Sequence, residues 1–310
     1  MTFLRILVGL ILFYIIWSSI EQRFLVTTKY AITSKKLGND FNGAKLVVLA
    51  DLHNNSYGKK NHRLLDRIDK LAPDMIIVAG DMITKYQPSI PSSAYSLMEE
   101  LVKKYPVYYA YGNHEQYLES LLDKDYLTDK NKRRNAADLE KARQQNKLLF
   151  ATWSDYLERL KAMGVIFLDN TGYTITKNNS KLRISGVSIE HKYFEHFELP
   201  DMEKVYLSSL VENTDNAYQI LIAHNPLYFK NYAEWGADLV LSGHLHGGIV
   251  RLPGIGGIVS PQVNFFPKYD SGSFTLNDTK MVVSRGLGTH SIMLRMFNRP
   301  ELVFITLKNS

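Results

Sequence analysis

Polar side chains that can bind metal ions follow five apolar runs in this chain. The runs KLVVLA, DMIIVAG, VYYAYG, QILIA and ADLVLSG lead into Asp51, Asp81, Asn113, His224 and His244. Three further histidines lie within two residues of these positions: His53, His114 and His246. Burying so many Asp and His side chains would be very costly unless they shared a cation. The pattern therefore predicts a metal site built from oxygen and nitrogen donors.

A hydrolase that uses two divalent metal ions would need this set of side chains. Two ions require about six or seven protein ligands, including one carboxylate that binds both. The ions lower the pKa of a water molecule and hold the oxygens of a phosphate group, so no serine or cysteine nucleophile is required. A neighbouring histidine could donate a proton to the leaving oxygen. These residues thus favour phosphoester hydrolysis.

The composition is typical of a globular protein and excludes several other kinds of site. The 310 residues are 45% hydrophobic and 22% charged, and the net charge of +6 favours an anionic partner. The absence of cysteine excludes disulfides, a thiolate nucleophile and iron–sulfur clusters. Any metal must therefore be held by oxygen and imidazole donors.

The apolar runs and the segments between them predict an α/β fold. Continuous Val- and Ile-rich runs indicate strands buried on both faces, and polar residues at their carboxyl ends lie where such sheets place their sites. Helical spacing of apolar residues predicts one helix that Asn61 caps and that ends before Pro73, and another over residues 92–104. Short strands at residues 274–276, 281–283 and 302–307 close the chain. We expect one layered domain.

The polar clusters also resemble a known family signature. In chain order they read DLH (51–53), GD (80–81), GNHE (112–115), a single His224 and GHLH (243–246). This order resembles the signature of the calcineurin-like metallophosphoesterases, over about residues 44–307. The later runs GHLHGGIVRLPGIG, FFPKYDSG, SRGLGT and NRPE resemble a bacterial subgroup of single-domain phosphodiesterases with an N-terminal membrane segment. The resemblance implies an αββα sandwich with metals at the strand ends.

The resemblance further implies a role for each matching residue. It assigns the first metal ion to Asp51, His53 and His246, and the second to Asn113, His224 and His244. Asp81 would bridge the two ions, and His114 would protonate the leaving group or steady the transition state. Family members use manganese, iron or zinc, all compatible with donors that lack sulfur, and we expect manganese.

The N-terminal segment predicts a membrane anchor. Residues 6–20 carry no charge, and a helix counted from Met1 reaches about 30 Å, the thickness of the hydrocarbon layer. We expect residues 1–21 to be an uncleaved single-pass anchor, with a cleaved signal peptide or a buried core helix as alternatives. Basic residues after the span weakly favour a cytoplasmic domain, whereas the short preceding tail favours export. We expect the domain, residues 22–310, to be extracytoplasmic at the cell membrane.

A polar segment at about residues 116–161 interrupts the alternation of strands and helices. Between Asp123 and Lys147 it holds eight basic and five acidic side chains, and it predicts one or two solvent-exposed helices. This basic insertion could be a simple surface excursion, a cap over the site or a contact for a phosphate-bearing substrate.

Two interpretations remain open for several other residues. Arg285 could bind a phosphate oxygen or support the core. Large apolar side chains near the C-terminus could pack inside the domain or face lipid: Met293, Leu294, Met296 and Phe297. We do not expect the remaining histidines to be ligands: His62, His191, His196 and His290.

We expect a membrane-anchored, dimetal phosphodiesterase or pyrophosphatase that acts on a phosphorylated lipid or a cell-envelope precursor. The membrane segment motivates this substrate class. A nuclease or nucleotide phosphoesterase is the alternative, but few aromatic side chains accompany the basic insertion, chiefly Tyr117, Tyr126 and Trp153, so nucleic acid is not the expected partner. A non-catalytic scaffold is disfavoured because every candidate ligand is present. The sequence predicts neither the substrate-binding residues nor the oligomeric state.

Overall fold

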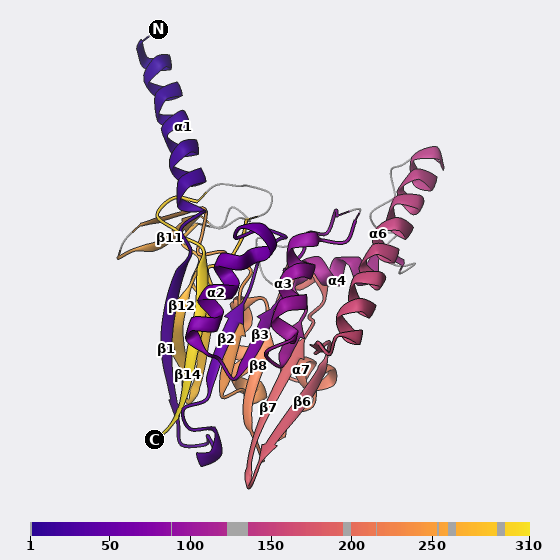
Figure 1. Cartoon of the computed structure of the whole chain (residues 1–310), viewed down its shortest axis with the longest axis vertical. Helices are drawn as coiled ribbons and strands as arrows, with labels where there is room; N and C mark the ends of the chain where they lie inside the picture. The colour runs from indigo at the N-terminus through magenta and orange to yellow at the C-terminus, as the bar shows by residue number, and fades with distance from the viewer. Residues whose placement is uncertain are drawn as a thin grey trace.

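Two six-stranded sheets form the centre of the protein (Figure 1). The computed structural model describes residues 2–87, 89–122, 136–194, 200–214, 216–252, 254–259, 265–289 and 295–310. The first sheet has the order β1 (Val26–Ser34), β14 (Glu301–Asn309), β2 (Lys45–Leu49), β3 (Met75–Ala79), β4 (Val107–Ala110) and β5 (Ile166–Phe167). The second has the order β12 (Gly272–Leu276), β13 (Thr279–Val283), β9 (Leu239–Ser242), β8 (Tyr218–Ala223), β7 (Ser180–Val187) and β6 (Thr171–Lys177). A separate hairpin pairs β10 (Val250–Leu252) with β11 (Gly256–Val259).

Helices cover the outer faces of both sheets. The first sheet packs against α2 (His62–Leu71), α3 (Ser92–Val102), α4 (Asn113–Glu119) and the second half of α6 (Ala136–Ala162). The second sheet packs against α7 (Tyr206–Leu210) and α8 (Phe229–Trp235). Alternate residues of β2 divide between the layers, since Leu46 and Val48 face the second sheet whereas Val47 and Leu49 face the helices. The predicted αββα sandwich is confirmed.

Parallel pairing brings the ends of the central strands to one edge. Strands β2, β3, β4 and β5 run parallel, and so do β7, β8, β9 and β13. Strand β14 runs antiparallel to β2, and β1 runs parallel to β14 with Val26 opposite Glu301. Strand β1 therefore begins at the edge where β2 ends.

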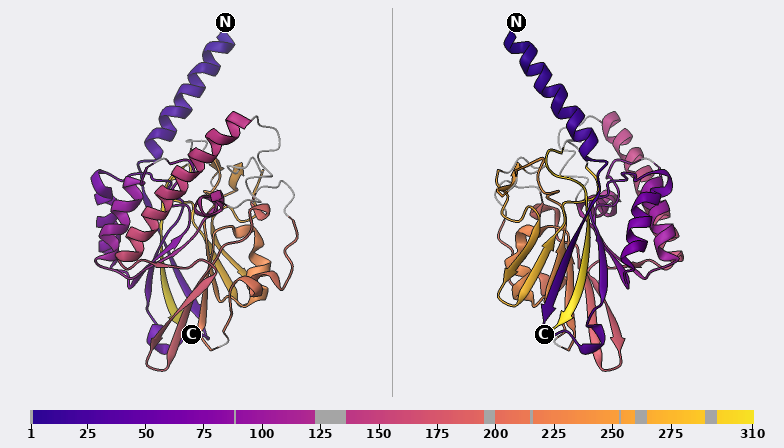
Figure 2. Two further views of the ribbon diagram at one scale, coloured as in Figure 1. Left: turned by 90° about the vertical axis from the view of Figure 1, so that its right-hand side faces the viewer. Right: turned by 60° about the vertical axis from the view of Figure 1, so that its left-hand side comes forward.

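Helix α1 (Thr2–Glu21) projects from this edge, whereas the C-terminus lies at the opposite end of the sheets (Figures 1 and 2). By length and composition, α1 is able to cross a membrane, and most of it is exposed. Among the described side chains of α1, the buried ones are Ser18 and Glu21, both in the last turn, which contacts the domain.

The predicted helices and closing strands are confirmed, but the predicted cap of α2 is wrong. The Asn61 side chain makes no capping hydrogen bond. Instead, its Oδ1 accepts from the Tyr57 backbone N–H, and its Nδ2 donates to Ser93. The Asn61 side chain thus connects the loop after β2 to α3. This role depends on Ser93, which lies 32 residues later in the chain.

The described part of the basic insertion divides into an exposed and a buried half. Residues 140–148 of α6 are mostly exposed, but Leu149, Trp153, Tyr156 and Leu160 belong to the core. The second half of α6 therefore differs from the solvent-exposed helix that the sequence predicts, because its apolar face packs on the first sheet. Residues 123–135, which carry most of the predicted positive charge, lie outside the described residues.

Candidate metal centre

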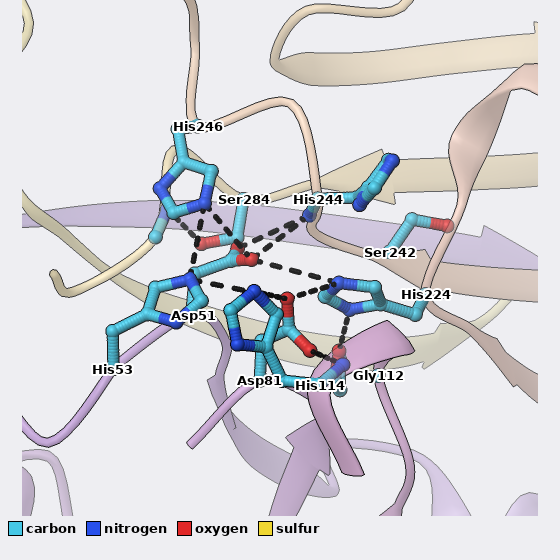
Figure 3. Close-up of polar contacts among 12 residues, drawn as sticks. Asp51, His53, Asp81, Gly112, His114, His224, Ser242, His244, His246 and Ser284 are labelled. Carbon is cyan, nitrogen blue, oxygen red and sulfur yellow. Dashed lines mark hydrogen bonds and ion pairs between the residues drawn. The ribbon is translucent and has the colours of Figure 1, made fainter. Parts of the chain in front are cut away.

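All eight predicted donors lie on loops or helix starts at the carboxyl edge of the two sheets. Figure 3 shows the two carboxylates and the five imidazoles among them. In the first sheet, Asp51 and His53 follow β2, Asp81 follows β3, and Asn113 and His114 begin α4 after β4. In the second sheet, His224 follows β8, and His244 and His246 follow β9. Apart from the half-buried Asn113, every one of these residues is buried.

Seven of the donors form three overlapping groups. In each group the potential ligand atoms lie within 4.8 Å of one another: Asp51, His53 and His246; His53, Asp81 and His114; and Asp81, His224 and His244. Because the groups share His53 and Asp81, they form one continuous centre rather than separate sites.

The two carboxylates lie among the imidazole rings. Asp81 Oδ2 is 3.1 Å from His224 Nε2, 3.9 Å from His53 Nε2 and 4.0 Å from His114 Nε2. Asp51 Oδ1 is 3.5 Å from His246 Nε2 and 3.7 Å from His224 Nε2. Asp81 thus faces three rings and Asp51 two, a difference that the sequence does not show.

Hydrogen bonds to the backbone orient two of these rings for metal binding. His224 Nδ1 is 2.7 Å from the Ala79 carbonyl, and His246 Nδ1 is 3.1 Å from the Gly288 carbonyl. Since a carbonyl can only accept, each Nδ1 carries the hydrogen, and the Nε2 of a neutral ring keeps its lone pair. Both Nε2 atoms face carboxylate oxygens, an arrangement that is favourable when a metal ion or a proton lies between them.

Two further features of the centre are compatible with metal binding. His53 Nε2 and His246 Nε2 lie 3.2 Å apart, at a distance that one hydrogen bond or a shared metal ion can join. Asn113 Oδ1 is buried and accepts no hydrogen bond from any residue within the described ranges. An amide oxygen among imidazole and carboxylate donors suits a borderline or hard divalent metal ion. The residues present therefore fit a two-metal site.

The buried charges influence one another strongly. Burial raises the pKa of Asp51 to about 7, and the neighbouring Asp81 carboxylate adds to the increase. Burial also tends to raise the pKa of Asp81, but His224 and His114 outweigh it and hold that pKa well below its usual range. For His224, burial tends to lower the pKa, whereas Asp81 and Asp51 raise it to about 10. The two carboxylates thus stabilise positive charge in the centre, and a bound metal ion would supply such charge.

The backbone at the donors is held in an unusual conformation. Five of them have positive φ angles, which cost energy in residues other than glycine: Asp51 (50°), His53 (47°), Asp81 (54°), His244 (71°) and His246 (53°). The motif glycines leave room for the carboxylates, since a Cβ at Gly112 would lie 2.1 Å from Asp81 Oδ1. Such strain clusters at functional sites.

Glu115 connects the loops that carry the donors, a role that the sequence did not reveal. Its buried carboxylate accepts hydrogen bonds from the backbone N–H groups of Asp81, Met82 and Gly112 and from the Tyr109 hydroxyl. The loop after β3 is thereby joined to the start of α4. Glu115 is the fourth residue of GNHE, so the motif was the available signal.

Residues 295–298 hold the backbone next to the metal centre in place through side-chain hydrogen bonds. The buried Arg295 guanidinium donates to the Gly288 carbonyl, 2.6 Å away, which also faces His246 Nδ1. Asn298 Nδ2 donates to the carbonyls of His246 and Gly248. Both residues lie in or beside the NRPE run. The partners of Asn298 are 52 and 50 residues away in the chain, whereas Gly288 is seven residues from Arg295.

Replacing Asn298 with Leu should destabilise the protein. The substitution keeps the volume but leaves two buried carbonyls without their donor, which costs about 1–3 kcal/mol of unfolding free energy. Chemical denaturation measures the loss, with Asn146→Leu on the projecting half of α6 as the matched control. Equal stability of the two variants would contradict the supporting role of Asn298.

The other residues singled out in the sequence lie apart from the three donor groups. Arg285 Nη2 donates to Glu301 Oε1 at 3.1 Å, which favours the supporting role for this arginine. His62 contacts the Lys59 carbonyl and His191 contacts Ser120 Oγ, and neither belongs to a donor group. His196, His290, Met293 and Leu294 lie outside the described residues.

Comparisons with known proteins agree with this geometry. The family model for calcineurin-like phosphoesterases matches residues 44–248. The chain is 23% identical to the metallophosphoesterase YkuE of Bacillus subtilis, across 94% of this chain and 88% of the relative. It is 24% identical to the phosphodiesterase YaeI of Escherichia coli, across 85% and 82%.

A third relative is named as a transmembrane protein. The chain is 27% identical to a transmembrane protein with a metallophosphoesterase domain from Danio rerio, across 90% of this chain but only 56% of that protein, so it spans about half of the relative's length. The family match covers more than half of the chain and includes all eight donors. The chain therefore belongs to the calcineurin-like phosphoesterases and is a metal-dependent hydrolase of phosphoric esters.

Proposed function

We propose that this enzyme cleaves a phosphodiester or pyrophosphate bond with two divalent metal ions, in a phosphorylated lipid or a cell-envelope precursor. The observation that carries the proposal is the position of Asp51 and Asp81 among five buried imidazoles, at the sheet edge from which α1 projects. A substrate held in the membrane by its lipid would meet the centre on that side of the domain.

The donors divide into two ligand sets around one shared carboxylate. Asp51, His53 and His246 would hold the first ion, and Asn113, His224 and His244 would hold the second. Asp81 would contribute to both sets, a role supported by the three imidazoles that face its Oδ2. When bound, the two ions supply Lewis acids for the phosphate oxygens and activate a water molecule. We propose manganese as the metal, which suits donors without sulfur.

His114 donates the proton to the leaving oxygen. The Lys85 backbone N–H donates to His114 Nδ1 at 3.0 Å, so the hydrogen of the neutral ring must be on Nε2. This Nε2 faces the centre, 4.0 Å from Asp81 Oδ2. The ring therefore presents an N–H to the place where a phosphate would bind, as general acid catalysis requires.

Helix α1 holds the enzyme in the cell membrane as a single span, with the domain on the extracytoplasmic side. The apolar length of α1 and the transmembrane relative support the anchor. Labelling of a single introduced cysteine at Val205 by a membrane-impermeant maleimide on intact cells tests the orientation, and an unlabelled protein would reverse it.

Hydrolysis assays on the full chain with manganese test the proposed reaction. We expect turnover of bis-p-nitrophenyl phosphate, and a higher kcat/KM for a detergent-dispersed lipid pyrophosphate than for DNA. Turnover of p-nitrophenyl phosphate alone would identify a monoesterase instead. Faster hydrolysis of DNA would favour a nuclease and overturn the proposed substrate class.

A further inference from the structure

The last turn of α1 is docked on the domain. Ser18 Oγ accepts a hydrogen bond from the Arg295 backbone N–H at 2.7 Å, and Glu21 Oε2 accepts one from the Phe297 backbone N–H at 2.7 Å. The ring of Trp17 lies 5.7 Å from that of Phe297, and its Nε1 donates to Glu21. The helix thus enters the domain without a flexible linker.

The length of α1 limits how far the domain can lie from a membrane. Its 20 residues extend about 30 Å, which is the full thickness of the hydrocarbon layer. If α1 crosses the membrane over its full length, its last turn lies at the membrane surface. Because that turn is docked on residues 295–297, the domain surface around it then lies next to the headgroup layer.

That surface is rich in exposed apolar side chains. Ile255 is 65% exposed, Phe265 68% and Phe266 63%. We call this set the α1-foot surface: Phe24, Leu252, Ile255, Phe265, Phe266 and Phe297. Elsewhere on the described part of the domain, the large exposed apolar side chains are few and dispersed: Tyr86, Leu148, Tyr173 and Val205. A concentrated apolar patch of this kind marks an interaction site.

Backbone contacts hold the α1-foot surface together. Residue Met296 pairs with the β10–β11 hairpin through Ile249 and Arg251, next to Phe297. The Phe266 N–H donates to the Ile258 carbonyl, which attaches the following segment to the same hairpin. Met296 and Phe297 therefore link the hairpin to the foot of α1, since the Phe297 ring contacts that of Trp17. The surface is thus continuous with the helix that would cross the membrane.

A basic cavity opens within this surface. It has a volume of about 550 Å³, and Leu252, Ile255, Phe266 and Phe297 share its lining with charged side chains: Arg251, Lys268, Asp270 and Arg285. Arg251 pairs with Asp270 and Arg285 with Glu301, whereas the Lys268 ammonium lies over the ring of Tyr269. Aromatic side chains together with basic groups match the interface of an anionic membrane.

We propose that the α1-foot surface lies in the headgroup layer of the membrane that α1 crosses, and that the basic cavity receives the headgroup of an anionic lipid. This inference rests on the proposed membrane anchor, but not on the identity of the substrate. It directs the edge with the metal centre toward the bilayer, because residues 295–298 contact both α1 and the loop of His246. A membrane-bound substrate could then reach the centre without leaving the lipid.

Single-cysteine labelling of the full chain tests the position of this surface. The chain has no cysteine of its own, so Ile255→Cys and Phe266→Cys can each carry one environment-sensitive fluorophore. We expect both labels to be blue-shifted in phosphatidylcholine–phosphatidylglycerol vesicles and quenched by lipids spin-labelled near the headgroup. Val205→Cys is the matched control, since Val205 is 68% exposed but lies outside the surface, and its label should stay in water.

The headgroup site has its own test. Lys268→Ala should weaken the quenching by spin-labelled phosphatidylglycerol at position 266 by about fivefold, with little change for spin-labelled phosphatidylcholine. Lys181→Ala, at the opposite end of the second sheet, is the control. Equal quenching by the two lipids in the parent protein would overturn the anionic headgroup site.

The remaining outcomes separate this inference from the proposed function. Flotation of the full chain with vesicles reports the anchor, and turnover of bis-p-nitrophenyl phosphate reports the enzyme. The membrane position of the surface would be overturned if the protein floats but the labels at positions 255 and 266 show the same emission and quenching as the label at position 205. A blue shift that appears only at high protein density would instead assign the surface to a second copy of the chain. Failure to float would remove both the anchor and this inference.

Discussion

Replacing Asp81 with Asn should lower kcat/KM for a phosphodiester by about 10³-fold or more. The Asp81 Oδ2 atom faces the Nε2 atoms of His224, His53 and His114, so it is the oxygen that most rings of the centre share. An amide keeps the shape of the side chain but removes the charge that a bridge between two cations requires. We therefore expect the variant to bind less than two equivalents of metal.

Metal content by mass spectrometry and steady-state kinetics measure this loss together. Asp69→Asn is the matched control, because Asp69 forms a partly exposed pair with Lys104 far from the donor groups. A variant at position 81 that retained two metal ions and full turnover would show that Asp51, the other carboxylate in the centre, takes the bridging role.

Replacing His114 with Ala should lower kcat by about 10²–10⁴-fold for a diester with a poor leaving group. The effect should be much smaller for a p-nitrophenyl ester, because p-nitrophenolate is stable without a proton. His114 can act as this proton donor because of its ring orientation. The Lys85 N–H donates to Nδ1, so the ring hydrogen is on Nε2, which faces the centre.

The metal content of this variant decides between two roles for His114. Its ring belongs to a donor group with His53 and Asp81, so the geometry also permits metal binding. A proton donor can be removed without loss of metal, whereas removal of a ligand would reduce the bound metal and lower turnover equally for both leaving groups. His62→Ala, on the surface at the start of α2, should change neither quantity.

The sequence predicted the fold class and the donors because both follow from local patterns. Runs such as DMIIVAG show burial on both faces, and a polar residue directly after each run must lie at a strand end. Parallel strands then bring those ends to one edge. The helices over residues 62–71 and 92–102 were equally legible from their apolar spacing.

Longer-range features were beyond the reach of such patterns. Asn61 is a good N-cap by type, but its side chain bonds to Ser93 instead. The second half of α6 carries charged residues and still contributes Trp153 and Tyr156 to the core. In both cases the deciding partner comes from another element, and the local sequence carries no record of it.

The amino-acid sequence alone thus determined which residue types can hold the metals and that they follow buried strands. Only the tertiary structure decided how they are used. The Gly288 carbonyl selects the nitrogen of His246 that faces Asp51. The Arg295 side chain donates to that carbonyl, and the Arg295 backbone N–H donates to Ser18 of α1. Hydrogen bonds depend on positions and directions in space, and the chain brings these partners together only when both sheets have packed.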